Sequence, residues 1–131
     1  MEIKELISKA IEGRSKTYSP YSKFGVGAAI LFKDGKYILG CNVENVSYGL
    51  TICAERNALF QMVSSGYTKD DVVAMAVVGD TINPISPWGA CRQVMAELLD
   101  MNTKIVLANI QYDYKETTVK ELLPYNFEGL E

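Results

Sequence analysis

Two cysteines and one glutamate have the types and spacing that indicate chemistry. Cys53 lies just before a predicted helix, and Cys91 lies in the first turn of the next one. A helix N-terminus carries partial positive charge, which favours a thiolate over a thiol, and thiolates bind metal ions. Glu55 follows Cys53 by two residues, so its carboxylate would lie beside anything that the two sulfurs held. The pattern fits a metal site, although buried cysteines that act as small hydrophobic residues would look the same.

The sequence contains three cysteines, the third being Cys41, and no histidine. This composition excludes Ser–His and Cys–His nucleophile pairs and any imidazole base. A metal site would have to use Cys, Asp and Glu side chains. The odd cysteine count and the charged N-terminal segment, which has no signal-peptide core, favour a reducing, cytoplasmic location without a disulfide framework.

Length, charge and hydropathy indicate one domain and argue against a nucleic-acid partner and a membrane span. The 131 residues suit a single domain over 1–131. The net charge of −3 comes with no basic stripe, so a nucleic acid is not the expected partner. No apolar run approaches the ~20 residues that a membrane span needs.

Apolar periodicity predicts the elements that must position these residues. We expect three long helices, and the expected ranges are 3–16, 54–64 and 90–99. We expect five strands, and their ranges are 26–32, 37–43, 72–78, 105–108 and 112–117. The unbroken apolar run over 72–78 is typical of a strand with helices on both faces. Thr118 and Glu121 form a capping-box pattern for a last short helix. The order predicts an α/β sandwich with a mixed sheet.

Two segments carry a resemblance to a known family. Cys53-Ala-Glu-Arg56 and Pro87-Trp-Gly-Ala-Cys-Arg-Gln93 together resemble the zinc signature of the cytidine deaminase family in its small homotetrameric form. The resemblance extends in order over nearly the whole chain, through residues 18–28, 40–45, 122–124 and 127. It implies a three-layer α-β-α sandwich with a mixed five-stranded sheet, which agrees with the predicted element order.

The resemblance also implies an activity: zinc-dependent hydrolysis of cytidine or deoxycytidine to the uridine product in pyrimidine salvage. It implies one zinc per subunit, held by three cysteine thiolates with water at the fourth position. Carried over by position, Glu55 is the catalytic proton shuttle, Cys53 and Cys91 are zinc ligands, and Arg56 offsets the thiolate charge. The implied substrate-binding residues are Phe24, Asn42, Glu44, Tyr48, Ala54 and Phe127. The implied partners are a nucleoside and three further copies of the chain, with Tyr48 and Phe127 partly serving neighbouring subunits.

Each of these positions has a plainer interpretation without the family. Asn42 and Glu44 at a strand end would simply face water. The aromatic residues would be core residues, Cys41 would only pack, and Arg56 would be an exposed helix residue.

The sequence departs from the family pattern at one position. The pattern requires a third cysteine where this chain has Trp88, and an indole offers an N–H donor but no lone pair for a metal. Even loss of an outer partner of a ligand costs about 10–100-fold in metal affinity, and loss of a thiolate should cost more. We therefore expect impaired deamination. The alternatives are a zinc-free, non-catalytic nucleoside-binding homologue and a blasticidin-type deaminase of another amino-pyrimidine.

Overall fold

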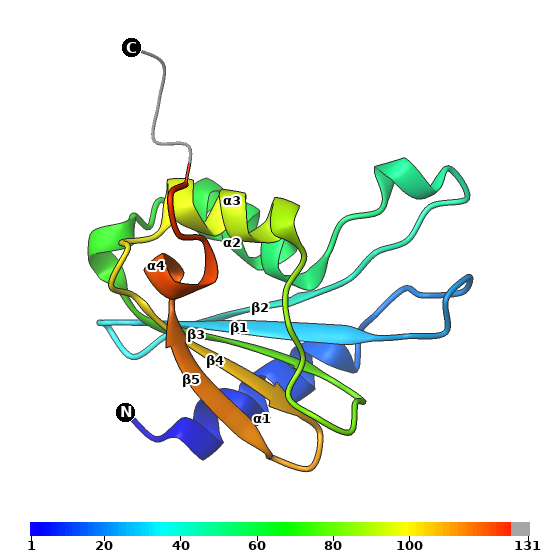
Figure 1. Ribbon diagram of the computed structural model, residues 1–131, viewed down its shortest axis with the longest axis horizontal. Coiled ribbons are helices and arrows are strands. Elements are labelled where there is room, and N and C mark those ends of the chain that lie inside the picture. The colour runs from blue at the N-terminus through cyan, green and yellow to red at the C-terminus, as the bar shows by residue number, and fades with distance from the viewer. Residues whose placement is uncertain (127–131) are drawn as a thin grey trace.

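The computed structural model describes residues 1–126, and its centre is a mixed five-stranded sheet in the order β2-β1-β3-β4-β5 (Figure 1). The strands are β1 (Val26–Phe32), β2 (Tyr37–Cys41), β3 (Val72–Gly79), β4 (Lys104–Asn109) and β5 (Tyr114–Thr118). Only β3 and β4 pair in parallel, and the other neighbouring strands are antiparallel. The mixed five-stranded sheet that the sequence predicts is confirmed.

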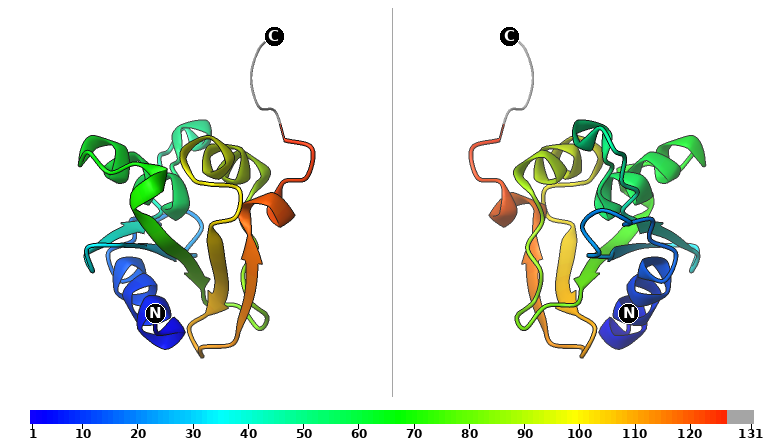
Figure 2. Two further views of the ribbon diagram at one scale, coloured as in Figure 1. Left: turned by 90° about the vertical axis from the view of Figure 1, so that its left-hand side faces the viewer. Right: turned by 90° about the vertical axis from the view of Figure 1, so that its right-hand side faces the viewer.

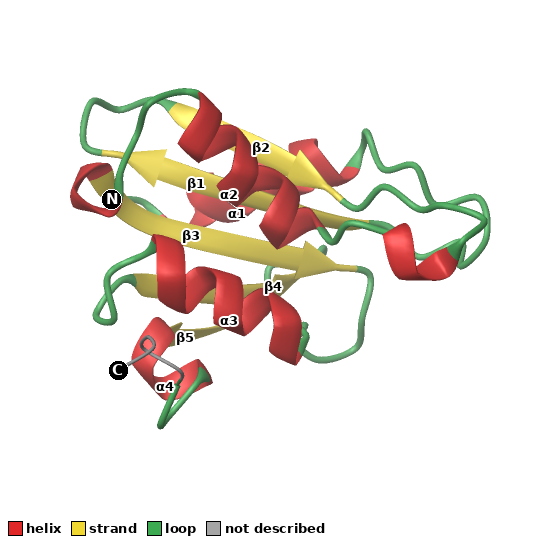
Figure 3. Cartoon of the chain, turned by 90° about the horizontal axis from the view of Figure 1, so that it is seen from above, coloured by secondary structure: helices red, strands yellow, loops and turns green. Residues whose placement is uncertain are grey.

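Helices cover both faces of this sheet. Helix α1 (Ile3–Arg14) lies on one face, whereas α2 (Ala54–Ser64) and α3 (Gly89–Leu98) lie side by side on the other (Figures 2 and 3). The short α4 (Val119–Leu122) follows β5 on the α3 side. Two short 3₁₀ helices, Tyr48–Leu50 and Lys69–Asp71, flank α2 in the chain. The result is the expected three-layer sandwich.

Each layer interface has its own apolar core. Leu6, Ile7 and Ala10 of α1 are fully buried against one face of the sheet. Leu59 and Met95, from α2 and α3, are fully buried against the other face. Seven of the eight residues of β3 are buried, which explains why the strand reads as an unbroken apolar run.

The first two strands form a hairpin whose turn follows from its sequence. Asp34 accepts a hydrogen bond from the backbone of Lys36 (2.9 Å), and Gly35 has a φ of +88°, which favours glycine. Ile30 pairs with Ile38 across the ladder.

Two element boundaries differ from the prediction, and one agrees with it. Helix α1 ends at Arg14 rather than at residue 16: the backbone N–H of Thr17 bonds to the carbonyl of Arg14 (3.0 Å), three residues back, and the Thr17 hydroxyl donates to Asn42. Strand β2 ends at Cys41 rather than at 43, because Val43 leaves the sheet and pairs with Ile52. At α4, Thr118 accepts the backbone N–H of Glu121 (3.2 Å), as the capping-box pattern predicts.

Within residues 1–126, the structure contains no helix with both the length and the apolar character that crossing a membrane requires.

Candidate functional site

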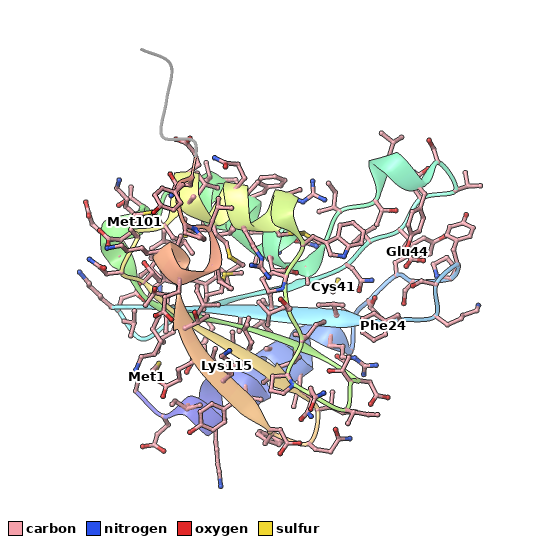
Figure 4. All side chains as sticks on the ribbon, in the orientation of Figure 1. Met1, Phe24, Cys41, Glu44, Met101 and Lys115 are labelled. Atoms are coloured by element: carbon pink, nitrogen blue, oxygen red, sulfur yellow. A yellow bond between two sulfur atoms is a disulfide. The ribbon has the colours of Figure 1, made fainter. Side chains whose placement is uncertain are left out.

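A pocket of about 150 Å³ opens at one end of the sheet, where the segment before β1 meets the loop after β2 and the start of α2. Figure 4 shows Phe24 and Glu44 at this end of the molecule, away from Met101. The pocket brings together seven residues that the sequence analysis singles out: Phe24, Asn42, Glu44, Tyr48, Cys53, Glu55 and Trp88. These residues come from segments far apart in the chain.

The two cysteines of the predicted metal site lie side by side. Cys53 is the half-buried residue before the first turn of α2, and Cys91 is fully buried in the first turn of α3. The structure joins their sulfurs as a disulfide. Convergence of two helix starts places both sulfurs at one point, which spacing alone does not reveal.

The backbone separation of the pair suits a shared ligand. Their Cα atoms are 7.3 Å apart, wider than the usual disulfide range of about 4.4–6.8 Å. Two sulfurs that each lie about 2.3 Å from one zinc ion are about 3.8 Å apart, which a wider backbone separation accommodates. Reduction of the pair thus provides two adjacent thiols for one metal ion.

Glu55 completes the group. Its carboxylate, in the first turn of α2, lies with the sulfurs of Cys53 and Cys91 in a set whose ligand atoms are all within 4.8 Å of one another. Burial raises the pKa of Glu55, and the nearby charge of Arg56 partly opposes that rise. The chain thus brings two thiolate ligands together beside the Glu55 carboxylate, one fewer than the three protein ligands of a catalytic zinc site when Glu55 serves as proton shuttle.

Arg56 contacts the sulfur pair directly. Its Nε donates a hydrogen bond to Cys53 Sγ over 3.2 Å. A guanidinium at this distance stabilises a thiolate and offsets its charge. The charge-offsetting role that the family resemblance implies for Arg56 stays a prediction.

Glycine at one position of β2 fixes where α2 begins. A Cβ at Gly40 would lie 2.5 Å from the carbonyl oxygen of Ala54 and 2.8 Å from the backbone nitrogen of Ala58. The helix therefore lies directly against the strand. Asn57 strengthens this contact by donating to the carbonyl of Cys41 (2.9 Å). Strand β2 thus determines the position of Cys53 and Glu55.

Glu44 is a buried carboxylate held by the segment before β1. It accepts hydrogen bonds from the backbone N–H groups of Tyr21 and Ser22, each at 3.0 Å, and from the hydroxyl of Ser22. The Ser22 hydroxyl, together with the two backbone donors, lowers the pKa of Glu44, so the side chain is ionised at neutral pH. An anionic acceptor therefore faces the pocket.

Asn42 holds the same segment in place. Its Oδ1 accepts the backbone N–H of Val26 (2.9 Å) and the hydroxyl of Thr17, and its Nδ2 donates to the carbonyl of Phe24 (2.9 Å). One Nδ2 proton is left over for a ligand hydroxyl. Asn42 thus organises the pocket wall, a role that its sequence context does not predict.

The remaining predicted residues fall into three groups. Phe24 and Tyr48 line the pocket and are 37% and 53% exposed, so they are not the core residues of the plainer interpretation. Ala54 is fully buried beside Cys53, and Phe127 lies outside the described residues. Cys41 is not part of the Cys53–Glu55–Cys91 group; burial raises the pKa of its thiol, which donates to the carbonyl of Lys16.

Arg92 is a structural residue of the site to which the sequence analysis assigns no role. Its guanidinium donates to the carbonyl of Pro87 (2.9 Å), the carbonyl of Leu122 (2.8 Å) and the hydroxyl of Ser86 (2.6 Å). These bonds attach the loop before α3 to α4. The sequence offered one signal for this role, because Arg92 directly follows the candidate ligand Cys91.

Trp88 is the residue that the sequence analysis assigns to the third cysteine position of the family pattern. It is the residue before the first turn of α3 and is 60% exposed, although Cys91 three residues later is fully buried. Most of the indole surface therefore faces solvent and the pocket rather than the buried sulfurs. Trp88 contributes no donor atom to the metal-binding group.

Comparison with known proteins identifies the family. Residues 1–108 match the family described as the cytidine and deoxycytidylate deaminase zinc-binding region. The chain belongs to the cytidine and deoxycytidylate deaminase family. It is 58% identical over 127 residues to a cytidine deaminase of Halalkalibacterium halodurans, covering 97% of this chain and 95% of that protein. It is 48% identical over 127 residues to a cytidine deaminase of Sporosarcina psychrophila, covering 97% and 92%.

The fold agrees with solved members of the cytidine deaminase family. A crystal structure of a cytidine deaminase from Burkholderia pseudomallei superposes with a TM-score of 0.94 at 51% identity, covering 97% of this chain and 100% of that one. The chain is thus a deaminase-family hydrolase, and its pocket combines Cys53 and Glu55 with Asn42 and Glu44, while Cys91 lies buried behind Cys53.

Proposed function

We propose that this protein catalyses the hydrolytic deamination of cytidine and deoxycytidine to uridine and deoxyuridine, as a step of pyrimidine salvage in the cytoplasm, and that Trp88 impairs this activity. One observation carries the proposal: Cys53 and Glu55 line the same pocket as the polar pair Asn42 and Glu44, and the buried sulfur of Cys91 lies within 4.8 Å of their ligand atoms. A metal site beside hydrogen-bonding groups suits a small polar substrate.

The polar pair would orient the nucleoside. The ionised carboxylate of Glu44 accepts protons from ribose hydroxyls, and the spare Nδ2 proton of Asn42 is donated to a hydroxyl oxygen. Phe24 packs beside the bound nucleoside, and Ala54 offers its backbone N–H to the base carbonyl. This orientation places C4 of the pyrimidine toward Glu55.

Glu55 would move the protons of the reaction. Water adds its oxygen to C4 and ammonia leaves, so the nucleoside and water become the uridine product and ammonia. Glu55 takes one proton from water and delivers it to N3, and then carries the proton of the new C4 hydroxyl to the amino group, which leaves as ammonia while the C4 carbonyl forms. Its burial keeps competing bulk water away from these transfers.

Cys53 and Cys91 would hold the zinc ion. When bound, zinc lowers the pKa of its water toward ~7, which supplies the nucleophile at neutral pH. Arg56 steadies Cys53 through its 3.2 Å contact. Because two thiolates balance the charge of Zn²⁺, Arg56 has less negative charge to offset here than in a three-cysteine site.

Exposed apolar residues support association into the homotetramer that the resemblance implies. Val46 and Leu50, in the loop after β2, are 81% and 66% exposed, and Phe60 on α2 is 47% exposed. We propose that neighbouring copies cover them and complete each pocket, with residues 1–131 forming one domain per subunit.

The test is uridine formation by the parent chain, by Trp88→Cys and by the matched control Trp88→Ser, each supplied with zinc under reducing conditions. We expect Trp88→Cys to raise turnover by at least ~10-fold. Trp88→Ser removes the ring without adding a thiolate and should stay near the parent. A Trp88→Cys protein that binds cytidine and zinc yet forms no uridine would contradict the proposed function.

The missing ligand also supports a second candidate, namely nucleoside binding without turnover. Saturable binding of cytidine by the parent, with no uridine formed even by Trp88→Cys, would favour this candidate.

A further inference from the structure

Trp88 presents a large aromatic surface to the pocket that the protein itself does not cover. The residue lines the pocket, yet it is 60% exposed. Burial of tryptophan contributes strongly to packing and to interfaces. A solvent-facing indole on a pocket wall is therefore available to a ligand that enters the pocket.

The indole of Trp88 shares its pocket with both carboxylates to which the proposed function gives a role. It stands at the start of α3, where Pro87 is buried and Arg92 fixes the preceding loop through the carbonyl of Pro87. The same pocket contains Glu44, the proposed ribose acceptor, and Glu55, the proposed proton shuttle. A nucleoside that fills this pocket therefore meets Trp88 as well as the two carboxylates.

An indole face recognises a flat heterocycle by stacking. This interaction requires neither a metal ion nor a particular exocyclic group, because every base has a π-face. Phe24 and Tyr48 add further partly exposed rings to the same pocket. The chemistry of the wall is therefore suited to a pyrimidine ring, whether it carries an amino group or a carbonyl at C4.

We propose that Trp88 is a base-contacting residue: its indole packs against the pyrimidine ring of a bound nucleoside and supports binding without a metal ion. This inference rests on the proposed function, because it uses the same nucleoside pocket. It predicts that the metal-free protein binds cytidine and uridine with similar affinity. The residue that removes one ligand for the metal thus adds one contact for the base.

The only tryptophan of the chain reports directly on this contact. The chelator-treated, reduced protein is titrated with cytidine, uridine and ribose while its intrinsic fluorescence is recorded, and N-acetyltryptophanamide controls for collisional quenching. We expect a saturable change with both nucleosides, dissociation constants within about threefold of each other, and no change with ribose. An emission that stays constant while calorimetry shows saturable binding would overturn the proposal, as would the absence of any binding.

Calorimetry on variants separates stacking from a structural role. Trp88→Phe keeps an aromatic face and should bind uridine within about threefold of the parent. Trp88→Ala should bind about tenfold more weakly, with an unchanged circular dichroism spectrum. Equal binding by Trp88→Ala would overturn the base contact and leave the proposed function intact, whereas a Trp88→Cys protein that binds zinc but neither nucleoside would overturn both.

Discussion

The contact between β2 and α2 predicts a large effect of adding a single methyl group. In Gly40→Ala, the new Cβ would lie 2.5 Å from the carbonyl oxygen of Ala54 and 2.9 Å from the Cβ of Ala58. Ordinary contact begins near ~3.5 Å, so the start of α2 must move by about 1 Å. Overpacking of this kind typically costs about 1–3 kcal/mol of unfolding free energy.

Because α2 carries Cys53 and Glu55, the same displacement disturbs the metal-binding group. We expect the melting temperature of Gly40→Ala to fall by roughly 5–10 °C, for a loss of about 2 kcal/mol. In the Trp88→Cys background we also expect weaker zinc binding. Thermal unfolding by circular dichroism and zinc titration measure the two effects.

A second glycine provides the matched control. A Cβ at Gly49 would meet no atom within 4 Å, and its φ is not in the left-handed region. Gly49→Ala should therefore leave stability unchanged or raise it by about 0.4–1 kcal/mol. If Gly40→Ala is as stable as Gly49→Ala, the inferred contact between β2 and α2 is wrong.

Three further predictions concern side chains around the pocket. The folded-state pKa of Glu44 lies below its unfolded value, so ionised Glu44 stabilises the fold above the unfolded pKa, and this stabilisation is lost as pH falls through the folded pKa. Melting temperatures measured below about pH 5 should therefore fall less steeply for Glu44→Gln than for the parent, and parallel curves would contradict this. Arg92→Ala removes three hydrogen bonds from the loop before α3 and should destabilise the chain by about 1–3 kcal/mol in urea unfolding, whereas Arg92→Lys should recover only part of that loss. Cys41→Ser should leave zinc binding of Trp88→Cys unchanged in a metal titration, since Cys41 stands apart from the metal-binding group; a several-fold loss would place its sulfur at the site.

The architecture could be predicted from the sequence because each element carries its own pattern. The apolar run of β3 indicates a strand covered on both faces, and the structure buries it there. The Asp34–Gly35 turn and the Thr118 cap are local interactions within a few residues. The ends of α1 and β2 could not be predicted, because long-range bonds to Asn42 and Ile52 determine them.

The site could be predicted only as a set of residue types. Family resemblance named Glu44 and Asn42, but not the bonds through which they hold the segment before β1. Spacing could not show that the sulfurs of Cys53 and Cys91 meet, since two helix starts must converge for that. Spacing likewise could not show that Arg92 holds the carbonyl of Pro87, the residue before Trp88.

Zinc content per chain tests the central claim most directly. The parent and Trp88→Cys are reduced, supplied with zinc, dialysed against metal-free buffer and measured by atomic absorption. The account predicts about one zinc per chain for Trp88→Cys and well below one for the parent, because only the variant restores three cysteine ligands. Equal zinc contents in the two proteins would contradict the assignment of position 88 to the metal site.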